Sequence, residues 1–458
     1  MTRILSFAFL ALMAFQSMGA TYYVATNGND ANSGSIGSPW LSPQYAANQA
    51  VSGDTVIVTA GIYTNHVDTV NSGVTFQGSG YPLISGFEVR HTNIVLRSFI
   101  FTATNSIIPS VYLRWAAESC QVLDSVFEHT PDNVGQIGLE LGDWGNRPRN
   151  AQIISNRFIN TKYYAMTLQG RGHMVASNYF TGTNGGDAIY LHSRDTTLYR
   201  NHWTNWSRPA GSSFHTDLIQ GFAVGGGVIA TNNVIDSNFG VNCVGCQIGN
   251  LSDDGEQLRI AFWTWRNNVW INVDAAMNMS APYMSFYNNT LYRCAQNTAG
   301  PFVFRSLTTG GKGHNARLFN NIFFECGSNP ANVGQGWYYF DVGLTNEVAD
   351  YNLVIGTGAG TTKVGFATLG REANGINGQD PLFINPSAYN VAVATNSPAV
   401  GAALDLSAFG FDNDFLGVTR TDPWTIGAYQ VPGTPAPPAS TGTVIRATTA
   451  RVGQIRRP

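Results

Sequence analysis

The sequence predicts an all-β protein: a single right-handed parallel β-helix, a three-sheet solenoid with an N-terminal cap and a short C-terminal tail. Three observations favour this class: an asparagine that recurs at solenoid-like intervals, strands with period-two alternation, and a turn-rich composition. The chain has 458 residues, of which 50 are glycine and only 12% are charged. About 25% charged residues is usual for soluble proteins, and abundant Gly, Asn and Thr fit strands joined by many turns.

The repeat is an asparagine that stands two residues before an apolar or β-branched residue. Its positions are spaced by 22, 23, 31, 35, 21, 32 and 32 residues: Asn156, Asn178, Asn201, Asn232, Asn267, Asn288, Asn320 and Asn352. A basic unit of 21–23 residues, with insertions, fits one coil of three short strands and three turns. We expect the coils to stack about 4.8 Å apart and the asparagine amides to form a ladder between them.

A second strand is expected downstream of each ladder position. In residues 187–192, Ile189 and Leu191 should point into the solenoid, while Tyr190 and His192 should point outward. Residues 164–169 and 239–243 show the same alternation, which indicates half-buried strands. Helical periodicity is confined to a short stretch near residues 44–50.

The two ends of the chain differ from the repeat. Arg3, an apolar run over residues 4–15 and small residues up to Ala20 predict a signal peptide over residues 1–20, and hence a secreted protein, extracellular or periplasmic. No later apolar run is long enough to suggest a membrane span. The solenoid is expected over residues 21–430, followed by a Pro-rich linker and a basic, disordered tail over residues 431–458. The net charge of −3 argues against a nucleic-acid partner.

At its two ends the chain resembles the secreted bacterial right-handed parallel β-helix proteins of the pectate-lyase-like superfamily. Residues 21–30, 38–40 and 53–63 look like their N-terminal cap and first coil, and residues 396–401 and 424–429 look like their final coil. The resemblance implies the fold but not one activity, because this superfamily holds lyases, glycoside hydrolases, epimerases and non-catalytic surface proteins.

In such an architecture, long turns beside one strand face form a groove for an extended polymer. The insertions here gather around the second strand of each coil, at residues 208–214, 250–258 and 308–313. Aligning residues 187–190 with residues 217–220 stacks Asp187 on Asp217 and Tyr190 on Gln220. Asn242 is expected to continue the second of these columns.

The expected activity is that of a polysaccharide lyase, which cleaves an extended acidic (uronic-acid) polysaccharide by β-elimination. His192 or His215 takes the C5 proton as a neutral imidazole, and Arg194 or Arg305 neutralises the uronate carboxylate. Asp187 and Asp217 orient the base or hold a cation. The substrate-binding candidates are Tyr190, Gln220, Asn242 and Lys312.

Two stacked carboxylates, Asp187 and Asp217, could bind calcium or act as a nucleophile and acid. They could equally cap turns by accepting backbone N–H bonds, and each candidate His and Arg has a similar structural interpretation. Two other functions stay open: a non-catalytic surface or matrix β-helix that binds glycans, and a glycoside hydrolase on the same fold. We expect a monomer.

The five cysteines are Cys120, Cys243, Cys246, Cys294 and Cys326. Cys294 and Cys326 each follow a ladder asparagine by six residues, so they should stack on neighbouring coils, either as a disulfide or as two buried thiols. Cys243 and Cys246 have metal-like spacing but no second pair, so a zinc site is not expected.

Overall fold

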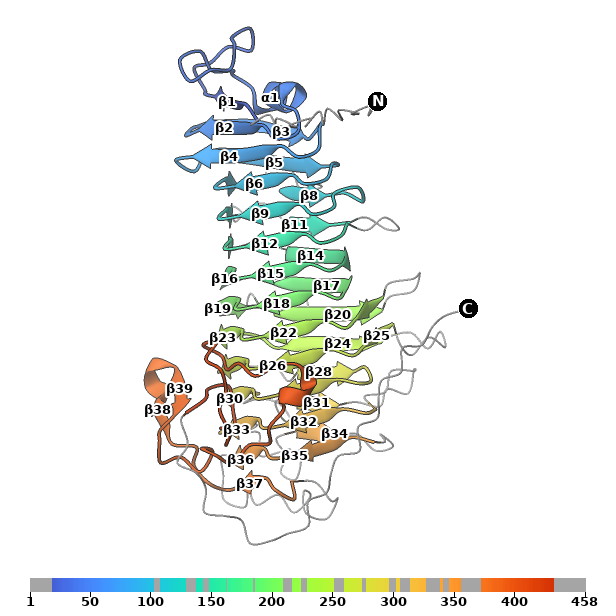
Figure 1. Ribbon diagram of the computed structural model, residues 1–458, viewed down its shortest axis with the longest axis vertical. Coiled ribbons are helices and arrows are strands. Elements are labelled where there is room, and N and C mark those ends of the chain that lie inside the picture. Colours follow the sequence, from blue (N-terminus) through green and yellow to red (C-terminus); the bar gives the residue numbers. More distant parts are fainter. Residues whose placement is uncertain are drawn as a thin grey trace, which may run out of the picture.

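The computed structural model shows a long solenoid of stacked strands with a cap at its N-terminal end (Figure 1). The described residues are 19–102, 108–128, 137–142, 148–161, 163–183, 186–208, 216–223, 229–250, 259–273, 277–295, 302–304, 314–326, 338–340, 346–355 and 372–431. The C-terminal tail beyond Val431 and nearly all of the expected signal peptide lie outside these ranges.

Each full coil contributes one strand to each of three sheets, and every pairing between coils in the described ranges is parallel. Sheet 1 has 13 strands in the order β1 (Thr21–Val24), β2 (Thr55–Thr59), β4 (Thr75–Ser79), β6 (Val95–Arg97), β9 (Gln121–Leu123), β12 (Gln152–Ile154), β15 (Met174–Ala176), β18 (Thr197–Tyr199), β22 (Val234–Asp236), β26 (Thr264–Arg266), β29 (Ser285–Tyr287), β32 (Arg317–Phe319) and β35 (Val348–Asp350).

Sheets 2 and 3 share their first strands, β3 (Ile62–Asp68) and β5 (Leu83–Val89), because the start of β5 pairs with β7 and its end with β8. Sheet 2 continues with β7 (Ile100–Phe101), β10 (Val126–Glu128), β13 (Arg157–Ile159), β16 (Tyr179–Thr183), β19 (His202–Ser207), β23 (Phe239–Val241), β27 (Val269–Ile271), β30 (Thr290–Tyr292), β33 (Ile322–Phe324), β36 (Leu353–Ile355) and β37 (Ile376–Asn377).

Sheet 3 continues with β8 (Val111–Leu113), β11 (Ile137–Leu141), β14 (Tyr164–Arg171), β17 (Ile189–Arg194), β20 (Ile219–Ala223), β24 (Cys246–Asn250), β28 (Met277–Ser280), β31 (Phe302–Phe304) and β34 (Tyr338–Phe340). Two short strands, β21 (Ala230–Thr231) and β25 (Ile260–Ala261), pair separately. The prediction of an all-β, three-sheet parallel β-helix is confirmed.

The N-terminal cap contains the one α-helix of the described chain, α1 (Pro43–Gln49), where the sequence showed its only helical periodicity. The hydroxyl of Ser42 accepts a hydrogen bond from the backbone N–H of Tyr45 at 3.2 Å and so caps the first turn. Trp40 stacks on Tyr22 of β1, with ring centroids 4.7 Å apart. The cap therefore covers the apolar end of the first coil.

Stacked aromatic side chains fill the solenoid under sheet 2. The ring centroids of Phe127 and Phe158 lie 4.6 Å apart, those of Phe158 and Phe180 lie 4.9 Å apart, and Trp203 follows at 5.2 Å. Because the strands are in register, each ring meets the equivalent ring of the next coil. Each coil therefore buries its apolar side chains against those of the coils on either side.

A continuous asparagine ladder holds the corner between sheets 1 and 2, but its register differs from the prediction over the C-terminal half. The ladder runs through Asn156, Asn178, Asn201, Asn238, Asn268, Asn289, Asn321 and Asn352. The predictions for Asn156, Asn178, Asn201 and Asn352 are confirmed. Those for Asn232, Asn267, Asn288 and Asn320 are wrong.

The error has a structural reason at the turn. The residue before each ladder asparagine has a positive φ, for example 60° at Ser155 and 53° at Asn267. Asparagine tolerates this left-handed conformation better than most other residues. At residues 267–268, 288–289 and 320–321 the first asparagine therefore makes the turn and the second joins the ladder. Asn232 makes a turn at another corner of the coil, before β22, where Asn233 bonds to Ser193 and Thr196 instead of to the ladder.

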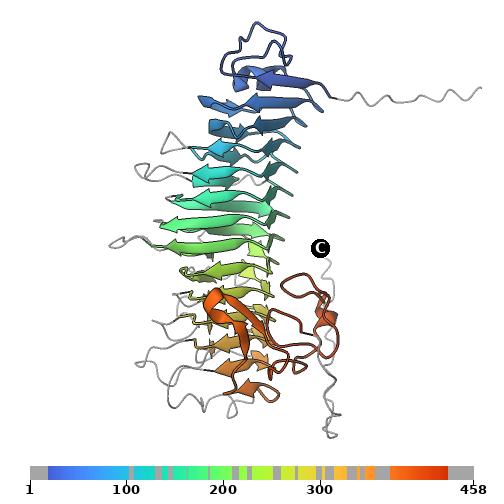
Figure 2. The same ribbon diagram turned by 90° about the vertical axis from the view of Figure 1, so that its left-hand side faces the viewer.

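Residues 378–431, here called the C-terminal strap, leave the coils after β37 and run back along the outside of the solenoid (Figure 2). The strap contains the hairpin β38 (Phe383–Asn385) and β39 (Asn390–Val393) and two short 3₁₀ helices, Pro386–Ala388 and Ser407–Phe409. Its apolar side chains pack on the outer faces of sheets 1 and 2. Residues 396–401 and 424–429, expected to form the final coil, belong to this strap instead.

The strap is held by the first asparagines of the Asn-Asn pairs. Asn320 Nδ2 donates to the Leu404 carbonyl at 2.8 Å, and Asn267 Oδ1 accepts from Arg420 Nη2 at 3.0 Å. The Arg420 guanidinium is 4% exposed and also donates to the Gly427 carbonyl at 2.9 Å. Asn267 and Asn320, which the spacing had assigned to the ladder, therefore bind the strap.

All five cysteines are buried free thiols. Cys294 and Cys326 follow the paired residues Tyr292 and Phe324 at the same distance, so they stand on neighbouring coils as predicted. Cys294 Sγ donates to the Trp270 carbonyl at 3.3 Å. Of the two alternatives for this pair, the structure has the thiols.

Candidate functional site

The outer face of sheet 3 is the face that the strap leaves uncovered. The strap packs on the outward side chains of sheet 2, among them Val241, Ile271 and Tyr292. Sheet 3 instead presents a row of mostly polar side chains on successive strands: Glu88, Tyr112, Glu140, Thr167, Tyr190, Gln220 and Gln247. In this row Glu88, Tyr112 and Thr167 are buried. Its half-buried members, Glu140, Tyr190, Gln220 and Gln247, can meet solvent or a ligand.

Strand β17 contributes three of the outward groups. Residues alternate along a strand, so Tyr190, His192 and Arg194 share the outer face, while Ile189 and Leu191 are fully buried inside. Tyr190 and Arg194 are half-buried, and His192 is 5% exposed. The predicted inward and outward assignments of this strand are confirmed.

The neighbouring strand β14 extends the same surface. Its Gln169 pairs with His192 and its Arg171 pairs with Arg194, so the two arginines lie side by side on adjacent coils. Neither Arg171 nor Arg194 is ion-paired within the described part of the chain. Two guanidinium groups therefore lie side by side at this edge of sheet 3.

Aromatic rings pack tightly in front of His192. The Tyr190 and His192 ring centroids are 3.9 Å apart, and Tyr164 stacks on Tyr190 with centroids 5.0 Å apart and an interplanar angle of 18°. Burial, with the nearby Asp187 carboxylate, raises the pKa of Tyr190 to about 12. The pKa of Tyr164 is raised further by burial and by its neighbour Tyr163. Both phenols keep their protons at neutral pH and can donate them.

Asp187 and Asp217 lie on adjacent coils, as the alignment predicted, and both are at most 4% exposed. Asp187 Oδ1 accepts a hydrogen bond from the backbone N–H of Asp217 at 2.8 Å, and Asp217 Oδ2 accepts from Gln220 Nε2 at 3.3 Å. These bonds are those of turn-capping carboxylates. They also fix Asp187 beside the phenol of Tyr190.

A calcium ion takes six to eight oxygen ligands, roughly, and often uses several carboxylates. In the described ranges, no group of three or more His, Cys, Asp or Glu side chains could hold a metal ion. Asp187 and Asp217 alone would supply part of such a shell. Calcium at this pair stays a prediction.

The predicted site residues therefore fall into three groups. Tyr190, Gln220, Asp187 and Asp217 come together as predicted on two neighbouring coils, with His192 and Arg194 on the same strand as Tyr190. Asn242 does not join them. His215, Arg305 and Lys312 lie outside the described residues.

The prediction for Asn242 is wrong because its position in the coil was misjudged. Gln247, not Asn242, pairs with Gln220 and continues the row. Asn242 directly follows β23 of sheet 2, has a φ of 54° and accepts a hydrogen bond from Asn272 Nδ2 at 2.9 Å. It belongs to a corner turn on another side of the solenoid.

Sequence reasoning missed Tyr164 and Arg171. The alternation over residues 164–169 predicts their strand but does not by itself give its register against residues 187–194. An alignment of the two segments would have placed Arg171 beside Arg194. The signal was therefore present in the period-two pattern.

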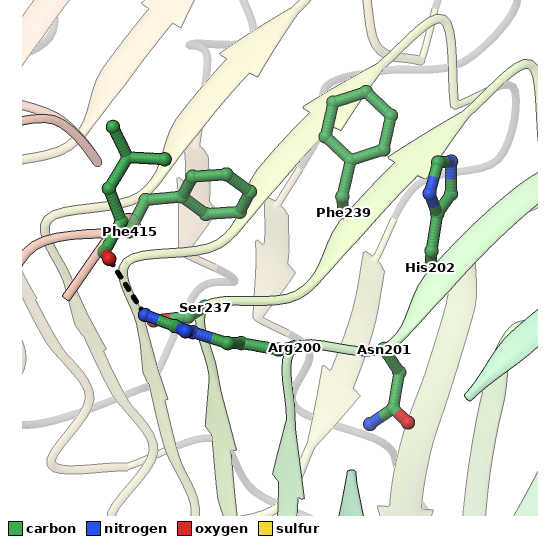
Figure 3. A pocket seen from close by; sticks show the side chains of 7 residues that line it. Arg200, Asn201, His202, Ser237, Phe239 and Phe415 are labelled. Carbon is green, nitrogen blue, oxygen red and sulfur yellow. Dashed lines mark hydrogen bonds between the residues drawn. The ribbon is translucent and has the colours of Figure 1, made fainter. Parts of the chain in front are cut away.

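A separate hollow of about 440 Å³ lies at the outer face of sheet 2, beside residues 415 and 416 of the strap (Figure 3). Its lining is Arg200, Asn201, His202, Ser237, Phe239, Phe415 and Leu416. Arg200 Nη2 donates to the Leu416 carbonyl at 2.8 Å, so this guanidinium holds the strap. Burial lowers the pKa of His202, and its ring packs against Phe239 with centroids 4.8 Å apart. The hollow marks an edge of the strap and contains no carboxylate among its lining residues.

The fold defines the chain as a parallel β-helix protein. No protein-family model matches the chain, and no curated protein matches it in sequence. Among solved structures, the complex of XylC with xylose is similar, with a TM-score of 0.50 and 12% identity over 91% of this chain and 99% of that one.

Two further solved structures resemble the chain. A mannuronic-acid-specific polysaccharide family 6 lyase from human gut microbiota has a TM-score of 0.46 and 11% identity, over 78% of this chain and 82% of that one. A tailspike protein of E. coli bacteriophage HK620 has a TM-score of 0.47 and 15% identity, over 70% of this chain and 64% of that one. At such identities the comparisons concern the fold. In the described ranges, none of the helices has the length and apolar character that a bilayer crossing requires.

Proposed function

We propose that the chain is a secreted carbohydrate-active protein that binds an acidic polysaccharide on the outer face of sheet 3 and cleaves it by β-elimination. The observation that carries the proposal is the outward row of β17, in which Tyr190, His192 and Arg194 stand on one strand beside Arg171. The XylC β-helix, solved with xylose, agrees with sugar binding on this architecture.

β-Elimination removes the C5 proton of a uronic acid, and the electron pair of that C–H bond forms the C4–C5 double bond as the glycosidic oxygen leaves C4. Arg194, assisted by Arg171, binds the uronate carboxylate and stabilises the enolate charge. The neutral imidazole of His192 accepts the C5 proton. Tyr190, whose raised pKa keeps the phenol protonated, donates a proton to the leaving oxygen.

The remaining predicted residues support these roles. Asp187 and Asp217 hold the turn that precedes β17 and β20, and Gln220 continues the binding row. His215 and Arg305 are the alternative base and cation, and Lys312 is a further contact for the acidic chain. Tyr190 is more exposed than His192, so a bound sugar meets the phenol first.

The test is to incubate the mature protein with separate polymers of mannuronate, guluronate, galacturonate and glucuronate. Near-ultraviolet absorbance of unsaturated products, together with new reducing ends, supports the lyase. New reducing ends without that absorbance would indicate a glycoside hydrolase. Binding without either product would indicate a non-catalytic glycan-binding protein.

Matched variants assign the site to sheet 3. Arg194→Ala and His192→Gln should abolish cleavage, while Arg157→Ala and His202→Gln should not, because the latter pair points outward from sheet 2. Thermal unfolding of each variant controls for folding. Full activity in His192→Gln would mean that another residue acts as the general base, and His215 would be the first to examine.

A further inference from the structure

A second hollow opens at the N-terminal end of sheet 3, several coils from β17. Its volume is about 360 Å³, and its lining residues are Glu88, Arg90, Arg114 and Trp115. Glu88 lies near the end of β5, and Arg114 and Trp115 directly follow β8. The hollow is thus built where two adjacent coils turn from sheet 3 toward sheet 1.

Both arginines converge on a single carboxylate oxygen. Arg114 Nε donates to Glu88 Oε1 at 2.7 Å, and Arg90 Nη2 lies 2.6 Å from the same oxygen. Burial alone would raise the pKa of Glu88, but the two guanidinium groups outweigh it and hold the pKa below its ordinary value. Glu88 is therefore ionised at neutral pH, and the three groups together carry a net positive charge.

The hollow exposes the Arg90 guanidinium to solvent beside an exposed aromatic ring. The Arg90 side chain is 56% exposed and Trp115 is 58% exposed. The Arg114 guanidinium lies 4.0 Å from the centroid of the Tyr112 ring, which fixes its orientation. A guanidinium recognises a carboxylate or sulfate through directed N–H donors, and an indole packs on the apolar face of a sugar ring.

The strand register connects this hollow to the site on β17. Val89 pairs with Leu113, and the same column continues through Leu141, Leu168 and Leu191. The residues that directly follow these form one outward row along the solenoid: Arg90, Arg114, Gly142, Gln169 and His192. Three coils separate Arg114 from His192, or about 14 Å along the axis.

We infer that Arg90, Arg114 and Trp115 form a second subsite, which binds an anionic sugar of an acidic polysaccharide lying along the solenoid axis. The inference rests on the proposed function for the polymer class. It adds the direction of the bound chain and a contact about three coils away from the reacting sugar. Gly142 adds no side chain to the row between the two subsites.

The test compares the wild type with the double variant Arg90→Ala, Trp115→Ala. Both side chains are more than half exposed, so the fold should survive, and thermal unfolding checks this. Arg97→Ala, an exposed arginine on sheet 1, is the charge-matched control. Calorimetric titrations use uronic-acid disaccharides, uronic-acid octasaccharides, a sulfated neutral octasaccharide and poly-glutamate.

The double variant should bind the uronic-acid octasaccharide about tenfold more weakly, with unchanged binding of the disaccharide, and should raise KM for the polymer without changing kcat. A similar loss with the sulfated octasaccharide would extend the subsite to sulfate esters, and loss with uronate alone would restrict it to carboxylates. Equal octasaccharide binding by the variant and the wild type overturns the subsite, even where the polymer is still cleaved. Poly-glutamate binding as tight as that of the uronic-acid octasaccharide, and lost in the double variant, overturns its assignment to sugars.

The two proposals fail in different ways. Binding of the octasaccharide that depends on Arg90 and Trp115, without any cleavage, refutes the lyase and retains the subsite. Cleavage with an unchanged KM in the double variant refutes the subsite and retains the lyase.

Discussion

The asparagine ladder can be tested at Asn238, where the structure departs from the spacing in the sequence. In Asn238→Ala, four side-chain hydrogen bonds are lost. Asn238 Nδ2 donates to the Leu198 carbonyl at 2.9 Å and to Asn268 Oδ1 at 3.0 Å. Its Oδ1 accepts from the backbone N–H of Asn201 at 2.9 Å and from Asn201 Nδ2 at 3.1 Å.

The expected loss follows from what remains behind. Asn238 is fully buried, so water does not replace its amide. The buried Asn201 backbone N–H loses the partner described above, which costs about 1–3 kcal/mol, and each of the other lost hydrogen bonds costs roughly 0.5–1.5 kcal/mol. Asn201 Nδ2 keeps its bond to Val175, and Asn268 Oδ1 keeps the backbone N–H of residue 238. We expect the free energy of unfolding to fall by about 4 kcal/mol.

The matched control is Asn232→Gly, at the position that the spacing had assigned to the ladder. Asn232 is exposed, with a φ of 57° and a side-chain bond to Asp195 at 3.2 Å. Glycine adopts a positive φ without strain, so this variant should lose less than about 1 kcal/mol.

Equilibrium urea unfolding, followed by tryptophan fluorescence, measures both variants. Their m values should match that of the wild type, so that the midpoints report stability. An equal loss in the two variants, or a larger loss in Asn232→Gly, would refute the ladder register described here.

Three further predictions address acid stability, the strap and calcium. Acidification from about pH 6.5 to pH 4 should lower the free energy of unfolding by up to about 3 kcal/mol through His173. Burial lowers the pKa of its imidazole to about 4, so the unfolded chain binds the proton first as the pH falls. Urea unfolding of His173→Gln should show a smaller loss of stability in acid, and an identical loss would contradict this assignment. Arg420→Met removes buried donors to Asn267 and Gly427, so limited proteolysis should cut the strap while the coils stay intact, and a resistant strap would contradict that role. Chelation of calcium should lower wild-type activity but not the residual activity of Asp187→Asn, and wild-type activity that is indifferent to chelation would end the calcium hypothesis.

The fold was predictable because each coil repeats the same pattern of inward and outward residues. Parallel strands in register repeat the same inward position, so Ile189 and Leu191 alternate with Tyr190 in a way that is visible locally. The stacking of Tyr190 on Gln220 followed from aligning two such strands. The ladder was harder, because at Asn267 and Asn268 both residues suit the turn and only the hydrogen bonds separate their roles.

The strap was not predictable from its own residues. Trp424 and Ile426 occur in a short apolar pattern that also suits a solenoid strand, and the choice between coil and strap depends on which surface is available to them. In the structure Trp424 packs beside Phe411 and Tyr287, outside sheet 1. This contact joins residues more than 130 positions apart, which a local pattern does not encode.

The outward residues of sheets 2 and 3 give the strongest argument for where function lies. On sheet 2 the outward column changes from Thr204 to Val241 at β23, and from there it stays apolar because the strap covers it. On sheet 3 the outward row at the same coils keeps Gln220 and Gln247. Large polar side chains add nothing to a packed interface unless they have partners, so a row that stays polar beside a covered apolar face has a different task. This contrast is the reason why the proposed binding site is on sheet 3, although the larger of the two hollows described above lies against sheet 2.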